Sequence, residues 1–272
     1  MKKQDFKGWL LVSDIDGTVL NHEFKTAPEN LTAIQNFVER GGMFTVGTGR
    51  APASAAFVSS AIPKTCPGVV LNGGAIYDFD SNRFLWQKQL HQEAVEVVEY
   101  IQRKFPFTSI EIHVGHDIYL VRSSPKGDVH ISEAGADIHR VSMEQVPKTG
   151  WNKVLFAAEE EQMQYLISQI ADIPLKEDRL VRTSTYYYEV LPRGIDKGVT
   201  VHRLAEMLQI PKEHICCIGD YYNDLEMLRS AAFSACVASS PDSIKSEVDM
   251  VCPDVMNGSL AYFIQEIENK LI

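Results

Sequence analysis

The sequence has little that would direct the protein to a nucleic acid or a membrane. Its 26 Lys and Arg are outnumbered by 36 Asp and Glu, so the net charge is −10, whereas nucleic-acid-binding domains usually carry a basic stripe. No apolar run approaches the roughly 20 residues needed to cross a bilayer. Asp14 and Asp16 interrupt the N-terminal apolar run too early for a signal peptide. We therefore expect a cytoplasmic protein that binds neither membranes nor nucleic acids.

Cysteine is also scarce and lacks any informative spacing. The five cysteines are an odd number, with no C-x-x-C pair and no Cys/His cluster spaced as in a zinc site. Three of them, Cys216, Cys217 and Cys236, lie in apolar stretches typical of strands. A chain of 272 residues is also too long for a small disulfide scaffold. We expect reduced, buried thiols.

Both ends of the chain alternate short apolar strands with helices. Strands are expected at about 9–13, 43–46, 215–218 and 233–237. Strands that are apolar almost throughout are typical of a parallel sheet whose two faces are both covered by helices. The segment Thr26-Ala27-Pro28-Glu29 predicts a capping box at the start of the first helix.

The middle of the chain follows a different pattern. Residues 110–114 and 118–122 alternate as in an antiparallel hairpin, helices are expected at about 91–105 and 159–171, and a strand pair near 179–191. The length exceeds that of one average domain. We predict an α/β fold in which a doubly wound, Rossmann-like parallel-sheet core is interrupted by an inserted α+β domain. The predicted ranges are 1–80 and 192–272 for the core and 81–191 for the insert.

The segment Asp14-Ile15-Asp16-Gly17-Thr18 follows the first apolar strand directly. Burying two carboxylates there is costly unless they are paired or bind a cation. At positions i and i+2 of a strand end, they indicate a site for a hard metal ion, with one oxygen available for nucleophilic attack. Taken alone, the segment could also be a turn after a strand.

Further polar residues follow strands or begin a helix in the parts of the chain assigned to the parallel sheet. They are Thr48, Lys197, Asp220, Asn223 and Asp224. Ligands of open α/β sheets bind beyond the carboxyl ends of the strands, where the strand order reverses. If the strands concerned are neighbours, these side chains meet the two aspartates in one cleft, around a single anion.

The residue types suit phosphoryl transfer. Asp14 is able to attack phosphorus, since an Asp carboxyl has a reference pKa of about 3.9, and an acyl phosphate splits one difficult hydrolysis into two easier steps. Asp16 is able to protonate the leaving oxygen and later to accept a proton from water. Mg²⁺ prefers oxygen ligands, here the side chains of Asp14 and Asp220 and the backbone carbonyl of Asp16. Donors for the phosphoryl oxygens are available at Thr48, Gly49, Lys197 and Asn223.

At these residues the chain resembles the haloacid-dehalogenase-like (HAD) phosphatase superfamily. The four motifs occur in order at 14–18, 48–50, 197–198 and 219–224. The size and position of the insert resemble the subgroup with a large α/β cap between the second and third motifs, which includes many sugar-phosphate phosphatases. Asn72-Gly73 and the run 237–241 resemble further stretches of that subgroup.

The resemblance implies a Mg²⁺-dependent phosphomonoester hydrolase that acts on a small phosphorylated metabolite, with a sugar phosphate favoured, through an aspartyl phosphate. It implies that Asp14 is the nucleophile and a metal ligand, that Asp16 is the acid/base with a backbone ligand, and that Asp220 is a metal ligand. Lys197, Thr48 and Asn223 would bind the phosphate, and Asp224 would orient Lys197 or a metal-bound water. In the cap, where no motif identifies the substrate, the best candidates for contacting it are Arg182, Tyr186 and Glu189.

Two alternatives stay open at this point. A phosphohexomutase, in which a hydroxyl group instead of water accepts the phosphoryl group, is compatible with the same core motifs. A non-catalytic protein that binds Mg²⁺ and a phosphometabolite to regulate a partner is the other alternative, although a binder has no need of Asp14 beside Asp16. The sequence indicates neither the substrate nor the oligomeric state.

Overall fold

The two ends of the chain form a parallel sheet of five strands, in the order β14-β13-β12-β1-β2, in the computed structural model, which describes residues 5–134 and 138–271. The strands are β1 (Leu10–Ser13), β2 (Met43–Val46), β12 (Ile215–Gly219), β13 (Phe233–Val237) and β14 (Met250–Cys252). β1 lies between β2 and β12. The strand order therefore reverses at β1: β2, which is next in the chain, lies on one side of it, and the late strands β12, β13 and β14 lie on the other. This is where an open α/β sheet binds its ligands.

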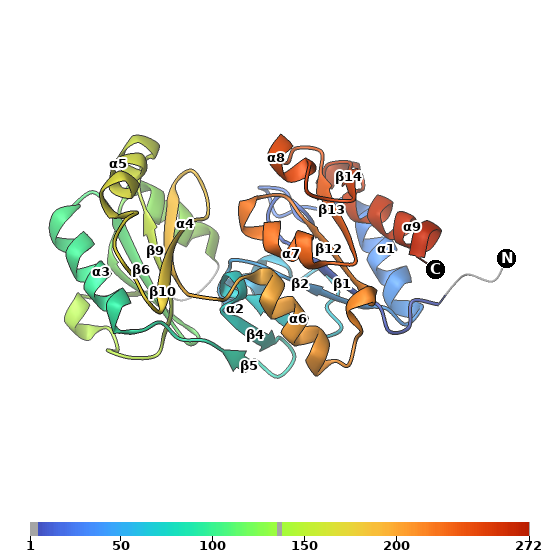
Figure 1. The fold of residues 1–272 in the computed structure, drawn as a ribbon, viewed down its shortest axis with the longest axis horizontal. Coiled ribbons are helices and arrows are strands. Elements are labelled where there is room, and N and C mark those ends of the chain that lie inside the picture. The colour runs from blue at the N-terminus through green and yellow to red at the C-terminus, as the bar shows by residue number, and fades with distance from the viewer. Residues whose placement is uncertain (1–4, 135–137, 272) are drawn as a thin grey trace. The chain divides into compact units, whose positions relative to one another are not determined.

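Helices cover both faces of this sheet, which explains why its central strands are apolar almost throughout. In Figure 1, α1 and α9 lie on one side of the sheet and α6 and α7 on the other. The helices formed by the two ends of the chain are α1 (Pro28–Glu39), α6 (Lys197–Met207), α7 (Leu225–Ser230), α8 (Asp242–Lys245) and α9 (Ser259–Leu271). Short 3₁₀ turns are η3 (Lys212–His214), η4 (Tyr222–Asp224) and η5 (Val255–Asn257).

The predicted capping box at the start of α1 is wrong. Ala27 is the N-cap residue, and no side chain caps the helix. The hydroxyl oxygen of Thr26 instead accepts a hydrogen bond from the Asn30 side-chain amide, at 3.1 Å. Pro28 occupies the first turn, as expected. Proline is tolerated there because the N–H groups of the first turn make no hydrogen bond within the helix.

A small antiparallel sheet with the order β3-β4-β5 follows α2 (Pro52–Val58) along the chain. Its strands are β3 (Gly68–Val70), β4 (Ala75–Asp78) and β5 (Arg83–Gln87), and the turn η1 (Leu71–Gly73) joins β3 to β4. A parallel bridge between Gly47 and Val69 places β3 beside the chain that leaves β2. The turn η1 therefore lies near the carboxyl end of the central sheet.

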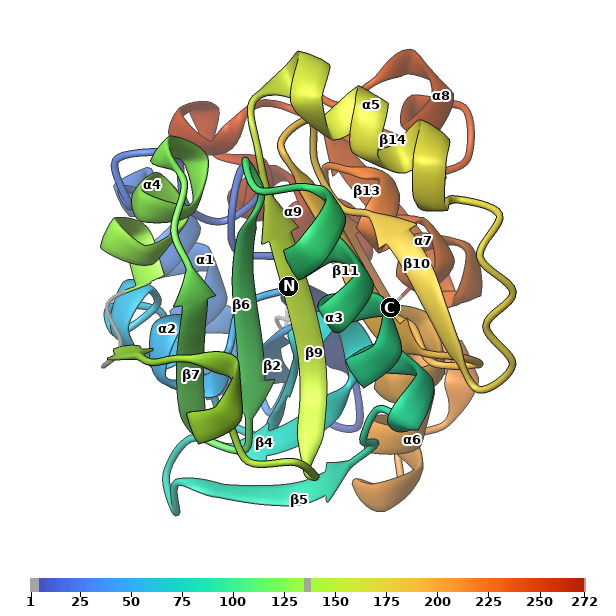
Figure 2. The ribbon, with the colours of Figure 1, turned by 90° about the vertical axis from the view of Figure 1, so that its left-hand side faces the viewer.

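The middle of the chain forms a separate sheet of six strands, in the order β10-β11-β9-β6-β7-β8 (Figure 2). The strands are β6 (Ser109–Val114), β7 (Asp117–Arg122), β8 (Ile138–Arg140), β9 (Trp151–Ala157), β10 (Asp178–Arg182) and β11 (Tyr187–Pro192). The helical segments are α3 (Gln92–Lys104), α4 (Pro125–Ala134), α5 (Glu160–Ile170) and the 3₁₀ turn η2 (Met143–Gln145).

The two faces of this second sheet differ in chemistry. One face contributes Ile110, Ile112 and Val154 to an apolar core shared with α3 and α5. Side chains alternate along a strand, so Glu111 points to the other face, where its carboxylate contacts His130 of α4 at 2.9 Å. The insert is therefore an α+β unit with an apolar face and a polar one.

The chain forms two units, the first made of residues 1–49, 58–86 and 196–272 and the second of residues 50–57 and 87–195. The predicted fold class, an α/β parallel-sheet core with an inserted α+β cap, is confirmed. The domain boundaries at 81 and 191 and the role of the insert in substrate selection stay predictions. All five cysteines are free thiols, and the three in the predicted strands are buried, as expected. Among the described residues, no helix is both long and apolar enough to cross a membrane.

Candidate active site

Asp14, Thr48 and Asp220 each follow a strand of the central sheet, and those strands are neighbours. The register aligns Ser13 of β1 with residues of β2 and β12 on its two sides. The backbone amide of Asp14 donates to Ile218 at 2.9 Å, and that of Gly47 donates to Ser13 at 2.9 Å. The carboxyl ends of β2, β1 and β12 therefore lie side by side, and they bring together residues that are far apart in the sequence.

Lys197 reaches the same place from the start of α6. Asp196 caps that helix, its side chain accepting a hydrogen bond from the Val199 amide at 2.8 Å. The Lys197 ammonium donates to Asp14 Oδ1 at 2.7 Å and to Asp224 Oδ1 at 2.6 Å, and all three side chains are buried. The lysine therefore bridges the first and the fourth motif.

Asp224 organises the backbone that bears Asp220. Its second oxygen, Oδ2, accepts hydrogen bonds from the backbone amides of Asp220 at 3.0 Å and Tyr221 at 3.1 Å. Both oxygens of Asp224 are thus engaged, one by the lysine and one by the turn. The role of Asp224 in orienting Lys197 stays a prediction, and its use as a metal ligand would require those bonds to be replaced.

The turn after β1 holds Asp220 from the other side. The Thr18 hydroxyl donates to Asp220 Oδ1 at 3.3 Å. Gly17 has φ +83°, and a Cβ at this position would lie 2.6 Å from Asp220 Oδ2. Glycine is therefore required twice here, for its backbone conformation and for the close approach of the carboxylate. Thr18 was not among the predicted site residues, although it lies in the first motif.

The electrostatics follow from placing two buried carboxylates, Asp14 and Asp224, and the half-buried Asp220 around one ammonium. Burial raises the pKa of Asp14 to about 7, a shift that Lys197 opposes and that Asp224 and Asp16 increase. The pKa of Asp220 is also well above its usual range, because of burial first and of Asp14 and Asp224 next. For Lys197, burial disfavours the charged form, but Asp14 and Asp224 outweigh it and raise the pKa.

This cluster has the composition of a site for a hard cation. Asp14, Asp220 and Asp224 each offer a carboxylate oxygen, and these oxygens all lie within 4.8 Å of one another. Three carboxylates and one ammonium leave an excess of negative charge in a buried site, which is costly without a counter-ion. Because both oxygens of Asp224 already accept hydrogen bonds, Asp14 and Asp220 are the better ligands. Oxygen donors such as these suit Mg²⁺ or Ca²⁺.

The predicted phosphate-binding residues lie around this cluster. Thr48 is buried, and its backbone amide donates to Val69 at 2.9 Å. Asn223 belongs to η4, and its side-chain amide donates to Asn72 Oδ1 at 3.1 Å. In the sequence, Asn72 stands out only by its resemblance to the subgroup, and the structure brings it next to three predicted site residues, Thr48, Gly49 and Asn223. The side chain of Asp16, by contrast, is exposed.

The three residues predicted to contact substrate belong to the second unit, where two of them lie on opposite faces of one sheet. Arg182 pairs with Tyr188 and Glu189 with Val181 across β10 and β11, so their side chains alternate. Glu189 is buried and accepts from the Lys153 ammonium at 3.1 Å. The Lys126 ammonium lies 4.0 Å from the centre of the Tyr186 ring. Their contact with substrate stays a prediction.

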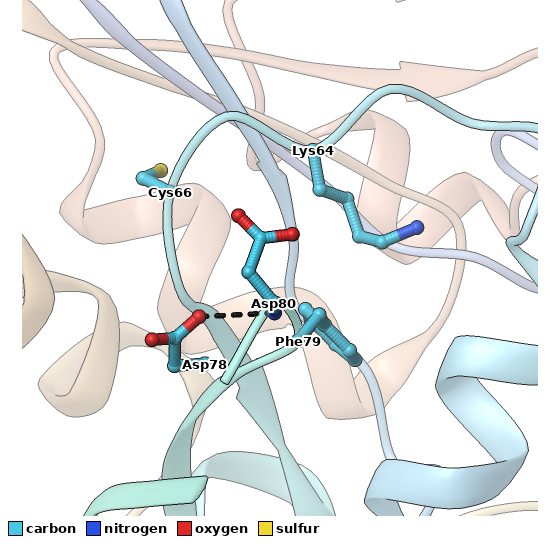
Figure 3. Close-up of a pocket in the computed structure, with 5 residues that line it drawn as sticks. All are labelled: Lys64, Cys66, Asp78, Phe79 and Asp80. Carbon is cyan, nitrogen blue, oxygen red and sulfur yellow. Dashed lines mark hydrogen bonds between the residues drawn. The ribbon is translucent and has the colours of Figure 1, made fainter. Parts of the chain in front are cut away.

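A pocket beside the small sheet contains none of the predicted residues. Figure 3 shows its lining, which consists of Lys64, Cys66, Asp78, Phe79 and Asp80. Asp78 accepts a hydrogen bond from the Asp80 amide at 3.1 Å, and Lys64 donates to the backbone oxygens of Ser59 and Ile62. Burial raises the pKa of the Cys66 thiol to about 12. The Asp78 bond holds the turn between β4 and β5, whereas the Lys64 bonds hold the segment before β3. A thiol with a raised pKa is a poor nucleophile, so the pocket favours no reaction at Cys66.

Known proteins with related sequences and structures match most of this chain. An HMP-PP phosphatase of Yersinia pseudotuberculosis is 26% identical over 241 residues, covering 88% of this chain and 87% of the relative. A 5-amino-6-(5-phospho-D-ribitylamino)uracil phosphatase of Bacillus subtilis is 24% identical, covering 96% and 97%. The crystal structure of a haloacid dehalogenase-like hydrolase from Bacteroides thetaiotaomicron superimposes with a TM-score of 0.84 at 22% identity, covering 95% and 99%.

The model of one protein family matches nearly the whole chain. It describes haloacid dehalogenase-like hydrolases and matches residues 11–264, so it includes all four motifs and the insert. The predicted superfamily and the prediction of an enzyme of the phosphatase class are confirmed by this match and by the relatives that are named phosphatases. The chain therefore belongs to the haloacid dehalogenase-like hydrolase family.

Proposed function

We propose that the protein is a Mg²⁺-dependent phosphomonoester hydrolase that acts on a small phosphorylated metabolite, with a sugar phosphate favoured. The observation that supports this most directly is the bridge from Lys197 to Asp14 and Asp224, with Asp220 beside it. Lys197 orients one carboxylate oxygen of Asp14, and the other oxygen stays available to a metal ion or to the substrate. That is the arrangement required of an aspartyl nucleophile.

The reaction takes place in two steps. A carboxylate oxygen of Asp14 attacks phosphorus, the bond from phosphorus to the ester oxygen breaks, and Asp16 donates a proton to the leaving alcohol. Asp16 then accepts a proton from a water molecule whose oxygen attacks the phosphorus of the aspartyl phosphate. The bond from phosphorus to Asp14 breaks, which releases inorganic phosphate and restores both carboxyl groups. The exposure of Asp16 gives it access to water.

The divalent cation would be held by the side chains of Asp14 and Asp220 and by the backbone carbonyl of Asp16. Its chemistry is the neutralisation of charge on the phosphoryl oxygens, since phosphoryl transfer depends mostly on positioning and electrostatics. Burial raises the pKa values of Asp14 and Asp220 most, and neighbouring negative charge raises them further, so a cation would favour the ionised nucleophile.

Donors for the substrate phosphate come from three separate elements. Thr48 and the Gly49 amide follow β2, Lys197 begins α6, and Asn223 lies in η4. Each offers an N–H or O–H group, which is what the phosphoryl oxygens need. Because α6 presents Lys197 from its first turn, the positive end of the helix dipole also faces the anion.

The choice of substrate class rests on the relatives and on the insert. The Bacillus subtilis relative is named for a substrate with a phosphate on a ribityl chain, which supports a phosphorylated polyol or sugar. The insert would select the leaving group, with Arg182, Tyr186 and Glu189 as the candidates.

Phosphate release tests this function. The protein should release inorganic phosphate from p-nitrophenyl phosphate and, with a higher kcat/KM, from one member of a panel of sugar, polyol and nucleoside monophosphates. Release should stop with EDTA and return with Mg²⁺. Asp14→Asn should abolish turnover, while Asp242→Asn, which changes a fully exposed carboxylate, should behave like the wild type.

Three results would overturn the proposal. One is the absence of phosphate release from every substrate in the presence of Mg²⁺, which would favour a non-catalytic binder. Another is turnover by Asp14→Asn, which would exclude Asp14 as the nucleophile. The third is a hexose 1-phosphate that yields the 6-phosphate without free phosphate, which would identify a mutase.

A further inference from the structure

The turn η1 has an unusual backbone. Leu71, Asn72 and Gly73 have φ values of 56°, 53° and 91°, so three consecutive residues adopt left-handed conformations. Asparagine and glycine accept this conformation readily, whereas a bulky leucine rarely does. All three residues are buried. A backbone of this kind persists only where the surrounding structure determines it, and such turns cluster at functional sites.

The first group of contacts connects the turn to the chain after β2. The backbone amide of Asn72 donates to the Thr48 carbonyl oxygen at 3.0 Å. The Asn72 side chain lies against Gly49, where a Cβ would lie 2.8 Å from Oδ1 and 3.0 Å from Nδ2. The two predicted phosphate donors of the second motif are therefore held by the backbone and the side chain of one residue.

A second contact connects the turn to the helix that begins with Lys197. The carbonyl oxygen of Gly73 accepts a hydrogen bond from the Thr200 hydroxyl at 2.6 Å, and both groups are buried. Thr200 lies one turn after Lys197 in α6. The position of this helix start relative to the second motif therefore depends on η1.

The third contact concerns the fourth motif. The Asn223 side-chain amide donates to Asn72 Oδ1 at 3.1 Å. An asparagine amide has two N–H groups and a carbonyl oxygen, and rotation by half a turn would exchange them. An acceptor at Asn72 Oδ1 determines which way the NH₂ group points, and it leaves the second N–H of Asn223 for a phosphoryl oxygen.

We infer that Asn72 is a positioning residue for phosphate binding: it orients the Asn223 amide and holds Gly49, while η1 connects all three donor segments. The inference rests on the proposed function, in which Thr48, Gly49, Lys197 and Asn223 bind the substrate phosphate. Asn72 does this through its side-chain oxygen and its left-handed backbone together. Donors that bind the phosphate equally in the ground state and the transition state affect KM more than kcat.

Asn72→Gly separates these two contributions, because glycine keeps the left-handed backbone and lacks the amide. We expect KM, and the inhibition constant of inorganic phosphate, to rise about three- to tenfold with a smaller change in kcat. Asn82→Gly is the matched control, since Asn82 also has a left-handed backbone, with φ 52°, but is exposed in the turn before β5. It should leave both constants unchanged.

A double-mutant cycle tests whether Asn72 acts through Asn223. Asn223→Ala should raise the inhibition constant of phosphate in the wild type and have little further effect in Asn72→Gly. Asn72→Asp keeps the oxygen acceptor, so Asn223→Ala should again raise the constant in that background. This second background also serves if Asn72→Gly does not fold.

Independent, multiplying effects of the two substitutions, or kinetics of Asn72→Gly that match those of Asn82→Gly, would overturn the inference. A wild-type protein that releases no phosphate would overturn the proposed hydrolase instead. In that case calorimetric binding of inorganic phosphate in the presence of Mg²⁺ still measures the coupling between Asn72 and Asn223. The two failures are therefore distinguishable.

Discussion

The ammonium of Lys197 lies 2.7 Å from Oδ1 of Asp14, although the two residues are separated by 183 positions in the sequence. Both side chains are buried, and a second carboxylate, that of Asp224, lies 2.6 Å from the same nitrogen. A buried ion pair is weak evidence of stability by itself, because desolvation offsets the attraction. This ion pair joins the end of β1, the start of α6 and η4, which carry the candidate site residues, so we assign it a role in the site.

Lys197→Met should lower both activity and stability. The substitution leaves the Asp14 and Asp224 carboxylates buried without the lysine ammonium. Breaking a buried ion pair in this way lowers the free energy of unfolding by about 3–5 kcal/mol. The loss should be smaller near pH 5 than near pH 8, since Asp14 takes up a proton more readily once Lys197 no longer lowers its pKa. Urea unfolding at the two pH values measures this.

Lys25→Met provides the comparison for that experiment. Lys25 is exposed and pairs with the exposed Glu23, and surface pairs of this kind contribute little to stability. An equal effect of both substitutions on the free energy of unfolding would contradict the importance assigned to the buried bridge.

Stabilisation by Mg²⁺ should increase with pH. Because the pKa of Asp14 is raised from 3.8 to about 7 on folding, the native protein binds more protons than the unfolded chain between these values. The free energy of unfolding without metal therefore falls as pH rises through that interval. Asp220 adds to the effect in the same direction.

A cation competes with those protons and favours the ionised carboxylates. The increase in the thermal midpoint caused by Mg²⁺, relative to EDTA, should thus be larger near pH 8 than near pH 5. Differential scanning fluorimetry across this range is the measurement. A shift that is larger at the acidic end would place the bound ion away from Asp14 and Asp220.

Gly17→Ala should weaken Mg²⁺ binding more than it affects folding of the remainder of the chain. A methyl group there would lie 2.6 Å from Asp220 Oδ2, and the position has φ +83°. Gly194→Ala provides a control with a similar backbone, φ +72°, and no neighbouring atom within 4 Å. Both variants include the cost of the left-handed backbone, so the difference between them isolates the displacement of Asp220.

The comparison of metal affinities by calorimetry separates these effects. Gly17→Ala should lose at least about tenfold in affinity for Mg²⁺ relative to Gly194→Ala, as expected when the support of a metal ligand is disturbed. Equal affinities in the two variants would show that Asp220 is not held by the turn after β1.

Glu189→Gln should destabilise the second unit by about 3 kcal/mol, because Glu189 is paired with Lys153 where both are buried. Adding Lys153→Met to this variant should recover part of the loss, because the double variant no longer buries an unpaired charge. Thermal unfolding of the two single variants and the double variant gives the coupling. A strictly additive double variant would contradict a stabilising pair.

Local patterns were sufficient to predict the catalytic core. Strands that are apolar on both faces imply a parallel sheet, and polar residues directly after such strands must lie at one edge of it. The structure brings Asp14, Lys197, Asp220 and Asp224 together for that reason. The order of the motifs was enough to predict this cluster, because a doubly wound sheet places the carboxyl ends of these strands side by side.

Three of the features that were missed or predicted wrongly depend on tertiary contacts. Strand β9 was not recognised, since all seven of its residues are buried, including Lys153, whose charge obscures the pattern until its pairing with Glu189 is known. The capping box failed because Ala27, not Thr26, became the N-cap. The contact of Asn72 with Asn223 joins residues 151 positions apart.

The sequence by itself therefore determined the parallel-sheet core and the strand ends at which the candidate site residues lie, because hydrophobic periodicity and short motifs are local properties. Only the tertiary structure decided which carboxylate oxygen each donor contacts, which polar residues are buried in pairs, and that one left-handed turn connects the predicted phosphate donors. Those features depend on distances between segments remote in the chain, and distances of this kind are set by packing.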